Sequence, residues 1–288
     1  MLTRVEPGSW RVVILTAVPE VAEMTATTLR RLGHDPVAAI GANRAKPTPG
    51  LTSLIQNSSV PGTEVLIASS KSEVEPLLQS MRPDLVLSWA FPWRVSPEAL
   101  AIPRFGAINY HPSLLPRHRG ANPVAWTIRM GDSHYGVTWH RMDPGFDTGA
   151  ILGQRSSPVL EEDTIYDVVP RLNVLALRML RPVLARIADG DPGDPQPNEG
   201  ATDAPPFGED YATIDWSMPA RYIHTQVRAW AFTPGTHSVV GPVAELGGEP
   251  VRVVRSSLDP PDPAQSHGVQ RVDCGDGPLW VLETESLV

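Results

Sequence analysis

The chain has 288 residues, 41% of them hydrophobic and 19% charged, which is ordinary for a globular protein and long enough for two domains. Its formal net charge of −8 disfavours broad binding to the phosphate backbone of nucleic acids. The single cysteine, Cys274, excludes a disulfide framework and a cysteine-based metal site, and no apolar run approaches the roughly 18 residues of a membrane span, so we expect a cytoplasmic protein with no metal and no membrane contact.

The first 188 residues alternate short apolar runs with helical patterns. Arg11 to Thr16 (RVVILT) is a continuous β-branched run of the kind that parallel sheets bury. Glu20 to Leu32 is predicted as a helix by its early acidic and late basic residues, and Gly33 ends it. Further strands are expected at 36–40, 64–68, 85–89, 106–110, 136–141 and 150–155, and helices at 51–56, 72–80 and 164–188. The pattern predicts a doubly wound α/β sheet, mostly parallel with a mixed edge, and Rossmann-like without the G-x-G-x-x-G nucleotide motif.

The last hundred residues have a different composition. Residues 189–211 are dense in proline, glycine and acidic residues, and we expect a solvated linker there. A helical pattern follows in IDWSMPARYIHTQVRAW, and then come short alternating runs (PVRVVRSSL, GVQRVDCG and LWVLE). These runs predict a small β-rich domain, an OB-like barrel. The predicted organisation is an α/β domain at 1–188, a linker at 189–211 and a β-rich domain at 212–288.

Three motifs in the middle third carry polar side chains that can converge. Asn109 and His111 share one face of a predicted strand because side chains alternate along it. The turn SLLP follows at 113–116. Asp147 lies in the glycine-flanked loop DPGFDTG, which can return over the strand end. An amide, an imidazole and a carboxylate in one cleft are suited to acyl transfer.

This ordered set resembles the folate-dependent formyltransferase family, whose members carry a strand-end N-x-H, then SLLP, then a D-x-G-x-D-T-G loop. The resemblance extends from about Arg11 to Leu282, and IDWSMPARYIHTQVRAW and CGDGPLWVLE resemble the C-terminal domain that several members share. It implies that residues 1–188 are a formyltransferase domain. It also implies that 10-formyltetrahydrofolate is the formyl donor and cosubstrate, with no metal.

The resemblance assigns roles to residues of this chain. Asn109 and protonated His111 would donate N–H groups to the formyl oxygen as negative charge develops there. Asp147 would hold His111 in its charged form and accept the proton of the acceptor amine. Arg117 to Arg119 is left open between a solvated turn and contact with an anionic part of the substrates. Other histidines are expected to be structural or on the surface: His118, His134 and His140. The expected folate contacts are Phe91, Trp93, Arg94, Val95, Ser113, Leu114, Leu115, Pro116, Met142, Asp143 and Gly145.

The acceptor amine is less closely specified than the donor. The tRNA enzymes of the family usually carry a basic insertion after the second strand, and residues 41–62 contain only Arg44 and Lys46 as positive residues, so a tRNA partner is possible but disfavoured. Pro112 resembles the purine-type and hydrolase members, since the tRNA and sugar enzymes typically have glycine there. We expect a small-molecule amine (an amino sugar, an amino acid or a natural-product precursor). Methionyl-tRNA formyltransferase and 10-formyltetrahydrofolate hydrolase are the alternatives, and the oligomeric state stays open.

Overall fold

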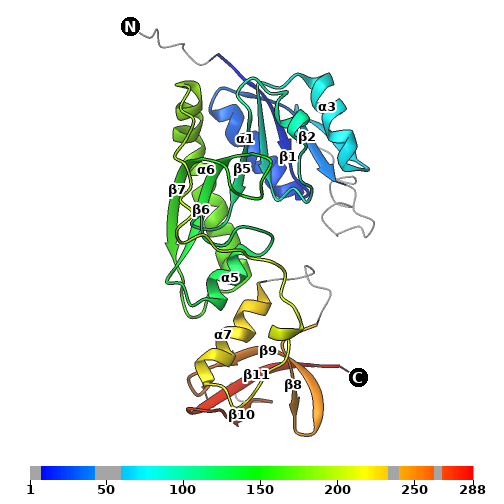
Figure 1. Cartoon of the computed structure of the whole chain (residues 1–288). Helices are drawn as coiled ribbons and strands as arrows, with labels where there is room; N and C mark the ends of the chain where they lie inside the picture. The colour runs from blue at the N-terminus through cyan, green and yellow to red at the C-terminus, as the bar shows by residue number, and fades with distance from the viewer. Residues whose placement is uncertain (1–7, 43–59, 233–239, 263–267, 288) are drawn as a thin grey trace. The chain divides into compact units, whose positions relative to one another are not determined.

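The computed structural model describes residues 8–42, 60–232, 240–262 and 268–287 (Figure 1). The chain divides into two compact units, the first of residues 1–119, 136–156 and 172–201 and the second of residues 120–135, 157–171 and 202–288. The domain boundaries expected at 188 and 212 stay a prediction. Among the described residues, no helix combines the length and apolarity needed to cross a bilayer.

A seven-stranded sheet in the order β3-β2-β1-β4-β5-β6-β7 forms the main layer. The first five strands pair in parallel, and β6 runs antiparallel to β5. The predicted doubly wound, mostly parallel sheet is therefore confirmed, with its mixed edge. The strands are β1 (Arg11–Leu15), β2 (Asp35–Ala42), β3 (Glu64–Ala68), β4 (Leu85–Trp89), β5 (Ala107–His111), β6 (His134–Arg141) and β7 (Ile151–Pro158).

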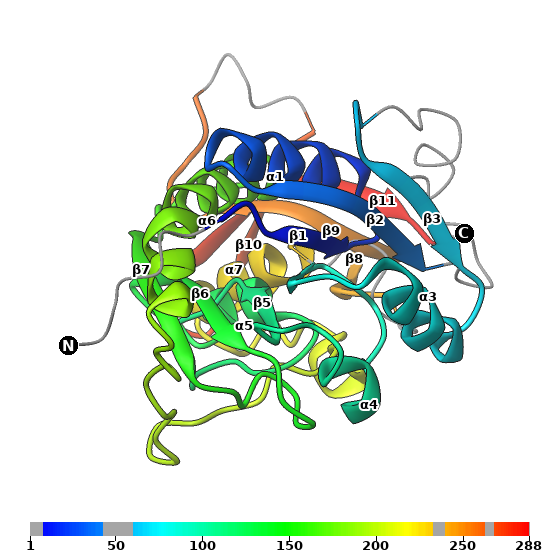
Figure 2. The same ribbon diagram turned by 90° about the horizontal axis from the view of Figure 1, so that it is seen from above.

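Helices cover both faces of this sheet. Figure 2 shows α1 (Pro19–Arg31) and α6 (Ile165–Ala188) on one face and α3 (Val74–Met81) on the other. Both faces of β4 are consequently buried, which is why its sequence, LVLSW, is almost continuously apolar. A 3-10 turn, η1 (Lys71–Glu73), leads into α3.

Two short helices were not expected from the sequence. α4 (Pro97–Leu100) begins after Ser96, whose hydroxyl oxygen accepts a hydrogen bond from the Ala99 N–H at 3.1 Å. α5 (Pro123–Arg129) has seven residues. Helices of this length complete too few turns for a 3.6-residue apolar period to be recognised. The helix expected at 51–56 lies outside the described residues.

The second unit contains α7 (Ala220–Ala231) and a four-stranded antiparallel sheet in the order β10-β11-β9-β8. Its core joins Ile223 and Val227 of the helix to Val253, Leu279 and Val281 of the sheet. This confirms the predicted small β-rich domain, although a strand pairing that would close a barrel does not occur among the described strands. The strands are β8 (Val243–Leu246), β9 (Glu249–Ser257), β10 (Gln270–Asp273) and β11 (Pro278–Ser286).

The segment 189–211 differs from the solvated linker that its composition predicts. Asp194 pairs with Ile151 at the start of β7, and Ala204 and Phe207 are 0% and 3% exposed. The 3-10 turn η2 (Glu209–Tyr211) closes the segment. Proline-rich sequence lacks helical or strand periodicity, but its restricted backbone can still be fixed on a folded surface by individual hydrogen bonds.

Candidate functional site

β5 presents Asn109 and His111 on one face of the sheet, as the strand alternation predicts. Tyr110 between them turns to the opposite face, where its ring lies 4.3 Å from that of Trp89 and 5.8 Å from that of Trp139. Trp139 in turn donates a hydrogen bond from Nε1 to the Ala176 carbonyl of α6 at 3.0 Å. This buried aromatic packing fixes the direction in which the two polar side chains point.

The loop between β6 and β7 carries Asp147. Asp147 has a φ of 55°, in the left-handed region that aspartate tolerates better than most residues. Asp143 shapes the loop by accepting a hydrogen bond from the Thr148 hydroxyl at 2.7 Å. Glycine is required at Gly149, because an added Cβ would overlap the carbonyl oxygen of Arg141.

The loop brings the Asp147 carboxylate to the two side chains of β5. Its Oδ1 lies 3.4 Å from Nδ2 of Asn109, and its Oδ2 lies 3.5 Å from Nδ1 of His111. His111 is 4% exposed. The three residues predicted as catalytic therefore lie together, with His111 buried and Asn109 and Asp147 partly buried, where electrostatic interactions are stronger than in water. Their roles stay a prediction.

His111 is held by a second contact that the sequence did not indicate. Its Nε2 lies 2.8 Å from the backbone carbonyl oxygen of His118, so Nε2 donates and Nδ1 is the nitrogen that faces Asp147. Burial lowers the pKa of His111 below its usual value and outweighs the Asp147 carboxylate, which raises it. Burial of His111 thus favours the neutral imidazole, and the charged form expected from the sequence depends on negative charge close to Nδ1.

The low pKa of His111 predicts a pH-dependent stability. As the pH falls through about 6.5, the unfolded chain takes up a proton at this residue before the folded chain does, so the free energy of unfolding decreases. Replacing His111 with Gln removes this contribution. Urea unfolding between about pH 7 and pH 5.5 should therefore show a smaller loss of stability in the variant than in the wild type. Equal losses of the free energy of unfolding in the two proteins would contradict a lowered pKa of His111.

His140 belongs to the same site, although the sequence led us to treat it as structural or surface. The antiparallel register places it directly opposite Asn109 on β6. Its Nδ1 donates to the Arg141 carbonyl at 2.7 Å, which in the neutral ring leaves Nε2 to accept from Nδ2 of Asn109 at 3.2 Å. The Nε2 atom also lies 3.4 Å from Oδ1 of Asp147. Only the strand register, which the sequence does not specify, reveals this position.

Most of the expected folate contacts that follow β4 pack in the same apolar cluster as Met142, which begins the loop that carries Asp147. Phe91, Trp93 and Met142 are partly buried and pack against one apolar cluster, to which Val95 also belongs. Arg94 is exposed, and its guanidinium carbon lies 5.1 Å from the ring centroid of Phe146, which is 62% exposed. The backbone N–H of Gly145 donates to Asp143 at 3.0 Å. The segment 91–95 and the loop 142–149 therefore lie side by side.

The SLLP turn packs on β6 and β7. Ser113 is fully buried and donates its hydroxyl to the Arg117 carbonyl at 2.7 Å. The buried Leu115 accepts a hydrogen bond at its carbonyl from the side-chain amide of Gln154 at 2.9 Å. Leu114 and Pro116 are half-buried. Ser113 and Leu115 are therefore buried structural residues of the turn, and only Leu114 and Pro116 keep surface that a ligand could contact.

Gly136 on β6 gives a test of the position of this turn. An added Cβ there would overlap the backbone of Ser113 and Leu114, so Gly136→Ala must push the turn away from the sheet. We expect the free energy of unfolding, measured with urea, to fall by about 1–3 kcal/mol. Gly277→Ala is the matched control, because an added Cβ there meets no atom within 4 Å. A Gly136→Ala variant as stable as this control would contradict the close packing.

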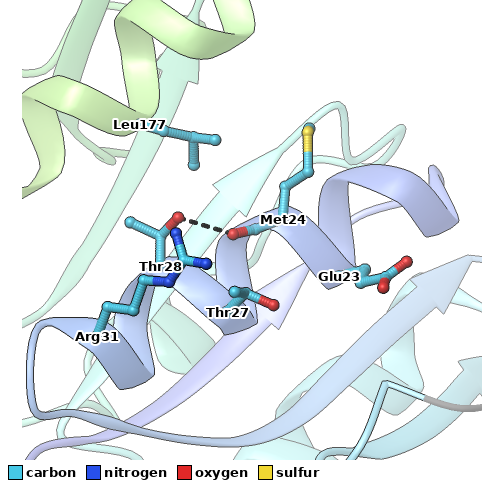
Figure 3. Close-up of a pocket in the computed structure, with 6 residues that line it drawn as sticks. All are labelled: Glu23, Met24, Thr27, Thr28, Arg31 and Leu177. Carbon is cyan, nitrogen blue, oxygen red and sulfur yellow. Dashed lines mark hydrogen bonds between the residues drawn. The ribbon is translucent and has the colours of Figure 1, made fainter.

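A separate hollow lies on α1 and α6 (Figure 3). Within it, the Thr28 hydroxyl donates to the Met24 carbonyl at 2.8 Å. None of the site residues predicted from the sequence line this hollow. In the described part of the chain, no three or more His, Cys, Asp or Glu side chains are grouped so that they could hold a metal ion. The hollow is lined by Glu23, Met24, Thr27, Thr28, Arg31 and Leu177.

Comparison with known families identifies the group to which these features belong. A family model described as formyl transferase matches residues 2–184, and a model of the formyl transferase C-terminal domain matches residues 209–286. The chain belongs to the formyl transferase family. The resemblance inferred from N-x-H, SLLP and D-x-G-x-D-T-G is thereby confirmed.

Relatives of this formyltransferase align along almost its whole length. The methionyl-tRNA formyltransferase of Trichlorobacter lovleyi is 29% identical over 291 residues, which cover 96% of this chain and 90% of the relative. That of Pelobacter propionicus is 31% identical over 296 residues, which cover 96% of this chain and 89% of the relative. Both enzymes are named for a tRNA substrate, so the sequence-based argument against a tRNA partner is not supported.

Solved structures share the fold of this formyltransferase. HypX from Aquifex aeolicus in complex with tetrahydrofolic acid has a TM-score of 0.67 and 14% identity, covering 98% of this chain and 45% of HypX. The N-formyltransferase from Helicobacter canadensis in complex with folinic acid and dTDP-3-aminofucose has a TM-score of 0.66 and 18% identity, covering 96% of this chain and 99% of that protein. At such identities the likeness is evidence for the fold alone.

Proposed function

We propose that this formyltransferase moves the formyl group of 10-formyltetrahydrofolate to a primary amine, with Asn109, His111 and Asp147 as its catalytic residues. The observation that carries the proposal is the convergence of these three side chains, with Asp147 3.4–3.5 Å from the other two. A hydrogen-bond donor, an imidazole and a proton acceptor in one buried site are the groups that acyl transfer needs.

In the proposed reaction the amine nitrogen attacks the formyl carbon, and the electrons of the C=O bond move to oxygen. Asn109 stabilises this oxygen by donating from Nδ2. His111 donates from Nδ1, because Nε2 is bound to the His118 carbonyl. Charge developing on the oxygen adds to that of Asp147 in favouring a proton on Nδ1. His111 takes this proton from solvent and returns it when the C=O bond re-forms, so the proton does not enter the net reaction.

Asp147 is the general base for the acceptor amine in this proposal. It accepts that proton, directly or through a water molecule, as the new C–N bond forms. The bond between the formyl carbon and folate N10 then breaks, and the proton passes to N10. The products are the formamide and tetrahydrofolate, so atoms and charge balance without a metal or an oxidant.

We propose that folate lies between the segment after β4 and the loop after β6. The stacking of Arg94 on Phe146 and the shared packing of Phe91, Trp93 and Met142 bring these two segments together. The folate compounds in the solved HypX and Helicobacter canadensis structures support a folate as the formyl donor.

The cytoplasmic location expected from the sequence stays a prediction.

Two acceptors are each favoured by a specific observation. Relatives aligned over 96% of the chain are named methionyl-tRNA formyltransferases, which favours the amine of a charged tRNA. The net charge of −8 and Pro112 favour a small-molecule amine. The loop on which the sequence argument about tRNA relied, 41–62, lies mostly outside the described residues.

Release of tetrahydrofolate tests these alternatives. The enzyme is supplied with 10-formyltetrahydrofolate alone, with methionyl-tRNA, and with a panel of amino sugars and amino acids. Acceptor-dependent release identifies the transferase and its substrate, whereas equal release without an acceptor identifies the hydrolase alternative. No release under any condition would overturn the proposed function.

A further inference from the structure

Residues 191–197 (DPGDPQP), here called the strap, are fixed beside the start of β7. Asp194 exchanges two backbone hydrogen bonds of 2.8 Å with Ile151. Arg186 of α6 pairs with Asp191 at 2.6 Å and with Asp194 at 3.1 Å. The Arg141 guanidinium also donates to the Asp191 carbonyl at 2.8 Å. These contacts hold a segment that has no regular secondary structure of its own.

Gln196 is the residue of the strap that reaches the Asp147 loop. It lies between Pro195 and Pro197, and a residue before proline favours an extended backbone, which limits the directions open to its side chain. Its Nε2 donates to the carbonyl oxygens of Asp147 and Gly149, both at 2.7 Å. The loop is thus bound on its backbone at two positions.

The other end of the Gln196 amide is also fully occupied. Its Oε1 accepts from Nε and Nη2 of Arg119, at 3.1 and 2.7 Å. Two donors and two acceptor positions are all that a glutamine amide has, so its orientation is determined. Arg119, which the sequence left open between a solvated turn and a substrate contact, therefore orients Gln196.

One of the two carbonyls that Gln196 binds belongs to Asp147, whose backbone conformation is unusual. Asp147 has a φ of 55°, and residues other than glycine persist in this region only where their surroundings hold them. Its carboxylate must also stay near Asn109 and His111, at the distances of 3.4 and 3.5 Å. A displacement of about 1 Å at such a site can cost about 100-fold in rate.

We infer that Gln196 is a positioning residue, which holds the backbone of the Asp147 loop so that the Asp147 carboxylate stays beside Asn109 and His111. The inference rests on the proposed function, because it assumes that this carboxylate takes part in catalysis. Gln196 itself touches no reacting atom. It acts through Asp147.

Gln196→Met removes both donors while keeping a side chain of similar length. We expect kcat to fall by about 10- to 100-fold, with the Kd for tetrahydrofolate unchanged and the variant still folded at the assay temperature. Asn198→Met is the matched control, since Asn198 is exposed two residues further along. A kcat equal to that of the wild type, or a loss that Asn198→Met shares, would overturn the inference.

The titration of His111 by NMR gives a readout that does not depend on turnover. The groups facing its ring are Asp147, His140, and the ring and carbonyl of His118. Because Asp147 raises the pKa of His111, displacing its carboxylate should lower that pKa further in Gln196→Met. An unchanged pKa would refute the positioning role even if the wild type shows no transferase activity, so failure of the inference and failure of the proposed function are distinguishable.

Arg119→Lys provides a second variant. Lysine keeps the charge but lacks the planar fork that binds Oε1 through two nitrogens, so the Gln196 amide becomes free to rotate. We expect a smaller loss of kcat than in Gln196→Met and a shift of the His111 pKa in the same direction. If both variants unfold, the strap supports the fold instead of the Asp147 loop, and the inference is wrong.

Discussion

Asp147→Asn is expected to lower kcat by about 10²- to 10⁴-fold, the range that a positioned general base or acid contributes. Asparagine has nearly the same size and shape, so the packing of the loop should be retained. It cannot accept the proton of the attacking amine, and it cannot favour a proton on His111 by charge. The measurement is steady-state formation of tetrahydrofolate at saturating 10-formyltetrahydrofolate.

Two comparisons make the Asp147 result specific. Asp189→Asn, at an exposed position after α6, makes the same change of charge away from the site and should leave kcat unchanged. The wild type and Asp147→Asn should bind tetrahydrofolate with similar affinity. A variant that keeps wild-type kcat would show that Asp147 does not handle the proton.

Asn109→Ala is expected to lower kcat by about 10²- to 10³-fold, as found when one donor to a developing oxyanion is removed. The Nδ2 group of Asn109 lies 3.2 Å from Nε2 of His140 and 3.4 Å from Oδ1 of Asp147. Both contacts are long, so a stronger acceptor such as an oxyanion can compete for its hydrogens. Because the charge develops only in the transition state, kcat should change more than KM.

The division of the effect between kcat and KM decides the role of Asn109. A raised KM with unchanged kcat would indicate that Asn109 binds the ground state and does not stabilise the oxyanion. Asn198→Ala removes an exposed amide and should leave both constants at their wild-type values. Equal loss in the two variants would show that the fall does not originate in the site.

Local sequence patterns were sufficient to predict most strands of the sheet and the main site residues. The run RVVILT predicts a buried strand because it is β-branched and apolar throughout, and β1 occupies Arg11–Leu15. The two-residue spacing of Asn109 and His111 places them on one face whatever the rest of the fold does. The helices α4 and α5 were missed because they are too short to show a period.

Contacts between segments distant in the chain could not be predicted from these local patterns. His140 lies 31 residues from Asn109 in the chain, and the register of β5 and β6 makes them partners. Gln196 lies 49 residues from Asp147, in a segment whose composition alone indicates solvated linker. The lowered pKa of His111 was also beyond the sequence, because it results from burial, and burial is a property of the folded chain.

The sequence by itself determined the alternation of strands and helices, the family, and the three side chains that form the candidate catalytic group. These follow from periods of two and about 3.6 residues and from motifs a few residues long, which act locally. The tertiary structure alone decided which nitrogen of His111 faces Asp147, that His140 joins the site, and that the strap binds the Asp147 loop. Each of these depends on distances across the fold, which no local period encodes, and on the desolvation that only a packed interior imposes.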